Sequence, residues 1–290
     1  MNHSKAQSYL FIHVAVILWG FTAILGELIT LRAIHLVWWR VAIISLCFVA
    51  WPGMVHKVRS LSPKVIYRIS FIGVIVGLHW LCFYGSIKLA NASIALISFS
   101  TTAFFTSFIE PIYTKSKISR VDVLFGLLVI PAMILVTKDF SWIYLLGFGV
   151  GILSALLAAY FSVLNKVSIN FAGPDVMTFI EMLAAFCLVT LIIPFVSLDQ
   201  FWVVSPKDVA YLLFLSIFCT ILPFILHLKA LKELSAFVTN LIVNLEPVYG
   251  ILLAVVILNN HDELNWSFYA GGSILVVLVF LYPYVKKRYA

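Results

Sequence analysis

The residues with the greatest potential for chemistry lie inside long apolar stretches of the chain. Glu246 stands in the middle of one stretch and is followed by Pro247, which removes a backbone donor and can free carbonyl groups one turn earlier. Asn240 and Asn244 are four residues apart, so they share one face of a helix. Such polar groups can bind a solute or a proton, or can form hydrogen bonds that only fix the packing of helices.

A second polar cluster lies between residues 98 and 107, where hydroxyl side chains alternate with phenylalanines. Its six hydroxyl residues are Ser98, Ser100, Thr101, Thr102, Thr106 and Ser107. Ser98 and Thr102 are four apart on one helix face and are candidates to line a cavity. Hydroxyl groups can also bond to carbonyls of their own helix, and that purely structural reading stays open.

Aromatic and imidazole side chains complete the predicted site. His79, Trp80 and Tyr84 would add an imidazole and aromatic walls, although a structural histidine fits the same pattern. Trp19 lies in the middle of an apolar stretch and is either a cavity wall or a core filler. The predicted solute-binding set is therefore Trp19, His79, Trp80, Tyr84, Ser98, Thr102, Asn240, Asn244 and Glu246. The sequence predicts no catalytic residue, cofactor or metal ligand.

Ten apolar stretches must position these residues, and each is long enough to cross a hydrocarbon core about 30 Å thick. They cover residues 9–29, 35–52, 67–90, 93–114, 121–137, 142–164, 174–197, 208–231, 235–258 and 266–284. The chain has 290 residues, of which 63% are hydrophobic and 11% charged, so little sequence is left for a water-soluble domain. An all-α integral membrane protein is expected, with a lipid bilayer as its surroundings and without a nucleic-acid partner.

Basic residues predict the orientation, because they are enriched in cytoplasmic loops. If both termini lie in the cytoplasm, the loops on that side hold Lys57, Arg59, Lys64 and Arg68 and then Lys115, Lys117 and Arg120, with further lysines nearer the C-terminus. The opposite loops hold only Arg32, Lys88, Lys138 and Lys207. This pattern predicts a multi-pass protein of the cell (inner or plasma) membrane.

Ten helices divide into two sets of five, which predicts two repeats, residues 1–138 and 139–290. An odd number of spans per repeat places the second upside down relative to the first. A shift of 144 positions places Lys88 on Lys232 and Ala92 on Ala236. Inverted repeats of this kind usually put a solute site near the midplane of the membrane, where the halves meet.

Short motifs distributed over the whole chain carry a resemblance to a known family. They are residues 18–21 (LWGF), 38–42 (WWRVA), 86–93 (SIKLANAS) and 245–249 (LEPVY). In these segments and in its architecture the chain resembles the drug/metabolite transporter superfamily, specifically its ten-helix EamA-type permeases. The resemblance implies transport of a small metabolite, such as an amino acid or a related solute, often as efflux.

Other ionisable residues have structural interpretations. Arg40 is expected to pair with Glu27, because a lone arginine in hydrocarbon is costly. The pair would be a structural clasp or an outer gate. Glu181 lies about two turns inside its span and has either a functional or a structural role. Three further residues lie near cytoplasmic ends and are expected to be solvated: His13, Glu110 and His227.

We therefore expect a secondary transporter that works by alternating access, with Glu246 as the candidate proton carrier. Removal from water penalises the charged form of a carboxyl group, so a buried glutamate is suited to bind and release protons. The chain contains no phosphate-binding loop, and direct drive by ATP is not expected. The alternatives are an intramembrane enzyme acting on a lipid or peptide and a non-transporting scaffold. The substrate, the direction, the coupling ion and the number of subunits stay open.

Overall fold

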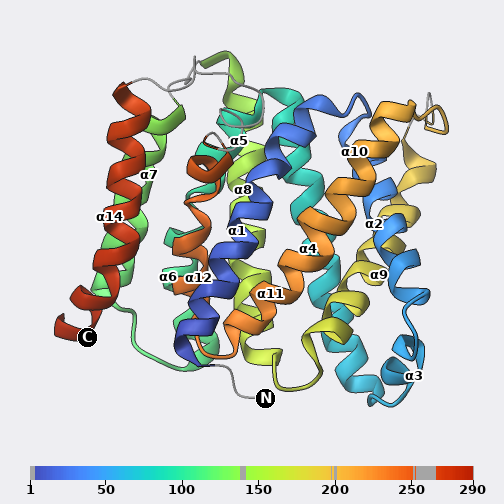
Figure 1. The fold of residues 1–290 in the computed structure, drawn as a ribbon, viewed down its shortest axis with the longest axis horizontal. Helices are drawn as coiled ribbons and strands as arrows, with labels where there is room; N and C mark the ends of the chain where they lie inside the picture. The colour runs from blue at the N-terminus through green and yellow to red at the C-terminus, as the bar shows by residue number, and fades with distance from the viewer. Residues whose placement is uncertain are drawn as a thin grey trace.

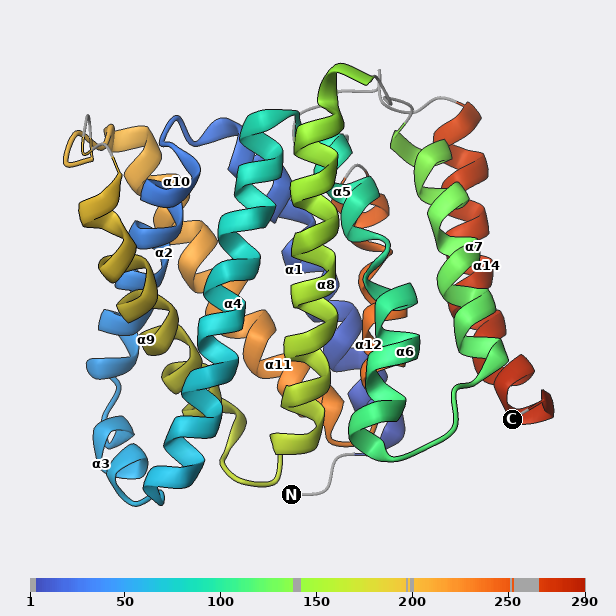
Figure 2. The ribbon, with the colours of Figure 1, turned by 180° about the vertical axis from the view of Figure 1, so that it is seen from behind.

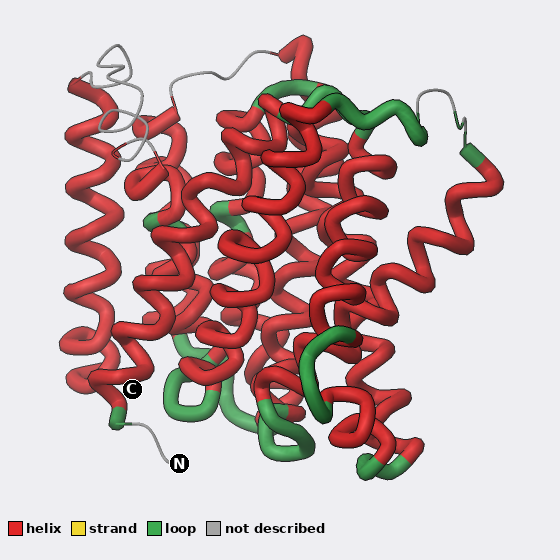
Figure 3. The backbone as a smooth tube through the Cα atoms, turned by 45° about the vertical axis from the view of Figure 1, so that its right-hand side comes forward, coloured by secondary structure: helices red, strands yellow, loops and turns green. Residues whose placement is uncertain are grey.

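Helices form the regular structure of this protein. The computed structural model describes residues 4–137, 142–196, 198, 201–250, 252 and 266–289, and these residues contain no strand (Figure 3). The α-helices are α1 Lys5–Leu28, α2 Ala33–Val49, α3 Met54–Arg59, α4 Pro63–Leu89, α5 Ala92–Phe99, α6 Thr102–Thr114, α7 Arg120–Thr137, α8 Leu145–Ser168, α9 Pro174–Ile192, α10 Pro206–Ser216, α11 Leu222–Leu231, α12 Ala236–Val243 and α14 Trp266–Tyr289. The prediction of an all-α protein is confirmed.

Seven of the described helical segments are long and apolar enough to cross a membrane. They are Lys5–Leu28, Pro63–Leu89, Ala92–Thr114, Leu145–Ser168, Pro174–Phe195, Pro206–Leu231 and Trp266–Tyr289. Helix α2 is apolar but shorter, with 17 residues. The second part of the predicted span 235–258 lies mostly outside the described residues. A multi-pass membrane protein is thus confirmed, while the count of ten spans stays a prediction.

The starts of the helices follow from local sequence. The Ser4 hydroxyl accepts a bond from the Gln7 amide and the Gln7 side chain accepts one from the Ser4 amide, which together cap α1. Helices α4, α9 and α10 begin at Pro63, Pro174 and Pro206. Proline is favoured in the first turn because the amide that it lacks would have no partner there.

Two broken helices occur in matching sequence positions. Helices α5 and α12 each have eight residues, and their N-cap residues Asn91 and Ser235 are 144 positions apart. Each helix ends in a two-residue turn, at 100–101 and at 244–245, after which the chain becomes helical again. The register found in the sequence therefore coincides with a shared backbone feature.

A glutamate meets the N-terminus of each broken helix. Oε1 of Glu27 accepts a hydrogen bond of 2.7 Å from the Ala92 amide. The carboxylate of Glu110 accepts bonds of 2.8 Å from the amides of Ala236 and Phe237. Glu110 is buried, so the expectation that it is solvated is wrong. Its position has a physical reason, because the first amides of a helix lack intrahelical partners and attract negative charge.

The long helices run between two ends of the molecule, and both termini lie at the same end (Figure 1). Helices α7 and α14 pack side by side at one edge of the molecule, while α2 and α9 lie toward the opposite edge (Figures 1 and 2). Helices α1, α4, α8, α11 and α12 lie between these edges (Figure 2). The central helices enclose the cavity described next.

Candidate functional site

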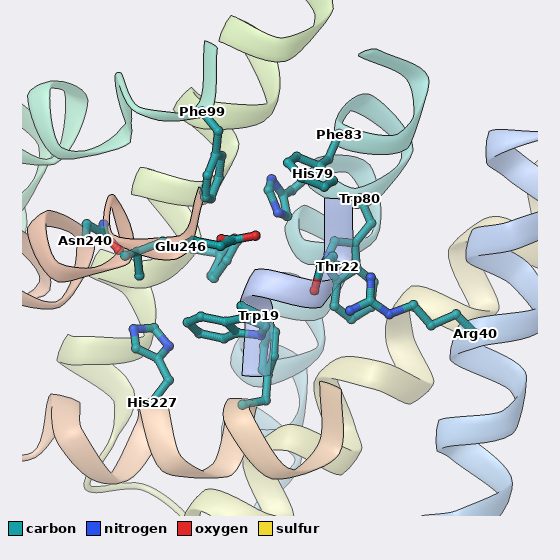
Figure 4. A pocket seen from close by; sticks show the side chains of 14 residues that line it. Trp19, Thr22, Arg40, His79, Trp80, Phe83, Phe99, His227, Asn240 and Glu246 are labelled. Atoms are coloured by element: carbon teal, nitrogen blue, oxygen red, sulfur yellow. The ribbon is translucent and has the colours of Figure 1, made fainter. Parts of the chain in front are cut away.

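An internal cavity lies among the central helices (Figure 4). Its lining residues come from α1, α2, α4, α5, α8, α11, α12 and the helical turn after α12: Trp19, Thr22, Arg40, His79, Trp80, Phe83, Phe99, Ala158, Phe161, Phe224, His227, Asn240, Val243 and Glu246. The space open to the centre of a water molecule is about 60 Å³. This space is sufficient for several water molecules, because one requires roughly 10–15 Å³ on the same measure.

Arg40 supplies the positive charge of the cavity, and the protein holds its guanidinium in a fixed position. Nε donates a 2.9 Å hydrogen bond to the Thr220 hydroxyl, and Nη1 donates one of 2.8 Å to the Tyr84 hydroxyl. The guanidinium carbon lies 4.1 Å from the centre of the Trp80 ring, in a cation–π contact. Arg40 forms no ion pair with Glu27, so that prediction is wrong. Two neutral hydroxyls accept two of its five N–H donors instead, while Glu27 caps α5.

A local distortion presents Thr220 to Arg40. The chain forms one turn of π-helix at Ile217–Ile221, between α10 and α11. Pro223 lacks a backbone donor, and its ring excludes the ordinary approach of the carbonyl four residues earlier, which favours such a distortion. The Thr220 hydroxyl donates a 2.7 Å bond to the Leu215 carbonyl while it accepts from Arg40. The distortion therefore builds part of the site.

Glu246 supplies a carboxyl group and lies in the helical turn that follows α12. Its side chain is 5% exposed and points into the cavity (Figure 4). Within the described part of the chain, its carboxyl group has neither a hydrogen bond nor an ion pair. Arg40 and Glu246 both line the cavity and form no ion pair with each other. A guanidinium and a carboxyl group therefore border one cavity.

Asn240 joins three helices at the edge of the cavity. Its Nδ2 donates a 2.8 Å hydrogen bond to the Thr106 hydroxyl of α6. Its Oδ1 accepts one of 3.2 Å from the Ser162 hydroxyl of α8. These bonds fix the orientation of the amide, because the donor and the acceptor each have a defined partner.

Two histidines line the cavity in different states of hydrogen bonding. Nδ1 of His79 lies 3.0 Å from the Ser154 carbonyl oxygen and 2.9 Å from the Ser154 hydroxyl. His227 is 3% exposed, and neither ring nitrogen has a partner among the described residues. The expectation that His227 is solvated is wrong, because α11 turns this residue toward the Trp19 ring, 5.6 Å away between centroids.

Aromatic rings form most of the remaining wall. Trp19 and Trp80 face Phe224 at centroid distances of 6.2 and 5.7 Å. Phe83 and Phe99 contact each other at 5.6 Å. Such walls are apolar but bind flat or cationic groups well through their π faces. The cavity thus combines a few fixed polar groups with a largely apolar surface, which is typical of small-molecule sites.

The structure brings five of the nine predicted residues together at the cavity: Trp19, His79, Trp80, Asn240 and Glu246. Tyr84 lies behind Arg40, to which its hydroxyl is bonded. Ser98 and Thr102 donate to the carbonyls of Ile94 and Phe99 in their own chain segment.

Asn244 likewise donates to the Asn240 carbonyl, and none of Tyr84, Ser98, Thr102 and Asn244 lines the cavity. The role of all nine residues in binding stays a prediction.

Sequence reasoning missed Arg40 and His227 as cavity residues. Arg40 was assigned to an ion pair, although its position inside a span was the signal that could have identified it. His227 lies one turn from basic residues at a helix end, which favoured a solvated interpretation. Only the packing of α11 against α1 turns it inward.

The fold and the cavity define a class, the multi-pass membrane proteins with a cavity among their central helices. The chain belongs to the EamA-like transporter family, whose model matches residues 6–138 and 145–282. A protein from Clostridium kluyveri described as an uncharacterized transporter is 22% identical over 217 residues, covering 71% of this chain and 67% of that protein. A solved structure described as "Crystal structure of protein" has a similar fold, with a TM-score of 0.76 and 13% sequence identity. The similarity covers 98% of this chain and 99% of the other chain.

Proposed function

We propose that this protein is a secondary transporter that moves a small zwitterionic metabolite, such as an amino acid, by alternating access. The observation that carries the proposal is that the Arg40 guanidinium and the Glu246 carboxyl group border one cavity without contacting each other. Arg40 would bind the carboxylate of the solute and Glu246 its ammonium group. The aromatic walls would receive an apolar side chain.

The arrangement of the two halves supports alternating access. Residues before 138 contribute Arg40, and residues after 139 contribute Glu246, so a bound zwitterion would bridge the halves. The broken helices α5 and α12 have equal lengths and lie 144 positions apart, which supports ten spans in two inverted repeats. In such transporters one half rocks against the other around a site near the midplane.

The same proposal includes orientation, direction and coupling. Loops rich in lysine and arginine favour a cytoplasmic position of both termini, in the inner or plasma membrane of the cell. The family resemblance favours efflux. Glu246 would carry the coupled proton, because the carboxyl can bind a proton on one side of the membrane and release it on the other.

Flux of labelled solutes into proteoliposomes tests the proposal. A panel should contain an apolar amino acid, its amide without a carboxylate, and the corresponding amine. We expect flux of the amino acid alone, and we expect Arg40→Gln to abolish it. Arg59→Gln, at an exposed position in α3, is the matched control and should behave as the parent. Equal flux of all three compounds, or normal flux through Arg40→Gln, would reject the assignment of the zwitterion.

A further inference from the structure

A second buried carboxyl group lies outside the cavity, between α8 and α9. Glu181 of α9 and Asn165 of α8 are both 0% exposed. Nδ2 of Asn165 lies 3.3 Å from Oε2 of Glu181, the only side-chain hydrogen bond between α8 and α9 in the described residues. Oε1 of Glu181 and Oδ1 of Asn165 are buried as well, and neither has a partner in the described part of the chain.

Among the described residues, no cation pairs with this carboxyl group. Helices α2, α3, α4 and α11 pack against α9, and α8 precedes it in the chain. The basic groups on these helices include Arg40, Lys57, Arg68, Lys166 and His227. Arg40 is bonded to Thr220 and Tyr84, and Lys57 is bonded to Asp175. Arg68 is bonded to Ser168, and Lys166 is bonded to the Leu231 carbonyl. His227 lines the cavity, and Glu181 has no ion pair in the described part of the chain. An ionised carboxylate here would be buried without a counter-charge, which is strongly unfavourable.

One added proton would give both unpartnered oxygen atoms a hydrogen-bond partner. The ionised carboxylate and the amide oxygen are both acceptors, so Oε1 and Oδ1 cannot bond to each other. A protonated Oε1 becomes a donor and can bond to Oδ1 after a small rotation of the side chains. Together with the existing bond from Nδ2 to Oε2, this closes a ring of two hydrogen bonds between an acid and an amide. The ring would tie α8 to α9.

A row of small and polar residues on α8 leads from this pair to the cavity. Ser154 bonds to His79, Ala158 lines the cavity, and Ser162 bonds to Asn240. Asn165 follows three residues after Ser162, so the two side chains are neighbours on the helix surface. Ser168 then bonds to Arg68 at the end of the helix. All five residues of this row are at most 2% exposed.

We propose that Glu181 is a second proton-binding site of this protein, held in its protonated form by Asn165. In the transport cycle the proton leaves when α8 and α9 separate, because the carboxylate then meets water and the ring of hydrogen bonds opens. Proton binding at Glu181 therefore stabilises the conformation described above. This inference rests on the proposed transport function for its role, but the site itself can be tested without any solute.

Infrared spectroscopy of the protein in liposomes, with the proton as the only ligand, tests the site. A protonated carboxyl group shows a C=O stretch that a carboxylate lacks. We expect Glu181→Gln to lose one acid band that Glu246→Gln retains. Glu233→Gln, at an exposed position, is the matched control and should retain every acid band of the parent. Asn165→Leu should shift the Glu181 band to higher frequency, since the acid loses its amide partner.

The outcomes separate this site from the transport function. Identical spectra of the parent and Glu181→Gln at all pH values would overturn the proton site, as would an unshifted band in Asn165→Leu. If Glu181→Gln does not fold, the shift in Asn165→Leu decides alone. A parent protein that shows the Glu181 band but moves none of the panel solutes would reject the proposed function and leave the site in place.

Discussion

At the scale of single residues, the cavity depends on a guanidinium whose position is already determined before a solute arrives. Nε and Nη1 of Arg40 are bonded to Thr220 and Tyr84, and the guanidinium carbon lies over the Trp80 ring, 4.1 Å from its centre. A fixed charge loses little freedom on binding, so more of the interaction energy is available for affinity. Tyr84 therefore acts on a solute through Arg40 and not by direct contact.

Tyr84→Phe tests this positioning role. The change removes one acceptor of Arg40, and a hydrogen bond to a charged group contributes about 1.5–3 kcal/mol. We expect the half-saturation concentration for the transported amino acid to rise roughly tenfold, since about 1.4 kcal/mol corresponds to a factor of ten. Initial rates in proteoliposomes measure the effect. Tyr67→Phe, at a residue that is 75% exposed, is the control, and equal values for both variants would contradict the role of Tyr84.

Glu246→Gln tests coupling at the same scale. Glutamine keeps the size of the side chain but cannot exchange a proton, so a pH gradient should no longer drive flux. Exchange of solute at equal pH should continue, although weaker ammonium binding will reduce it. Flux with and without an imposed gradient is the measurement. If the parent and the variant respond equally to the gradient, Glu246 is not the proton carrier.

At the scale of elements, small residues allow close helix crossings around the site. A methyl group at Gly73 of α4 would overlap the backbone of Glu181 in α9, and one at Gly250 would lie 2.6 Å from the Gly20 carbonyl oxygen of α1. The broken helices add short polar turns at 100–101 and 244–245. Close crossings and breaks together bring side chains from both halves to one cavity.

Gly73→Ala is expected to destabilise the protein, because the added methyl group forces α4 away from α9. Overpacking of this kind typically costs about 1–3 kcal/mol. Thermal unfolding in detergent, followed by the fraction that stays monodisperse, should show a lower midpoint. Gly149→Ala is the matched control, since no atom lies within 4 Å of its added Cβ. An unchanged midpoint for Gly73→Ala would argue against the tight crossing.

At the scale of the whole molecule, the termini and the charged loops lie at the ends of the helix bundle. Both termini lie at one end of the bundle, and α3 lies at the same end (Figure 1). Lys57 of α3 pairs with Asp175 of α9, and Lys286 near the C-terminus pairs with Asp122 of α7. The predicted orientation assigns this end to the cytoplasm. The orientation also decides which side of the cavity faces which compartment.

Labelling of introduced cysteines tests the orientation. The four native cysteines, Cys47, Cys82, Cys187 and Cys219, are first replaced by serine or alanine. Cysteine at Arg59 or Lys117 should resist an impermeant thiol reagent added outside intact cells, whereas cysteine at Lys207 should react. Cysteine at Asp262, which lies outside the described residues, should also react. The reverse pattern would invert the assignment of both faces of the cavity.

The sequence alone determined the class of fold and much of its register. Length and apolar composition predict membrane-spanning helices because a bilayer requires every backbone group to be satisfied within the element. The shift of 144 positions correctly aligned α5 with α12, since N-caps and turns are local features of a few residues. Glu246 and Asn240 were identified because a polar residue inside an apolar span is visible without any knowledge of packing.

Tertiary structure decided the partners of these polar groups. Arg40 bonds to Thr220, which is 180 positions away in the sequence, and not to the nearby Glu27. Glu110 is buried because α12 packs against α6, and His227 is buried because α11 packs against α1. The physical reason is that a buried polar group binds whichever partner the packing brings within about 3 Å, and hydropathy contains no information about that distance.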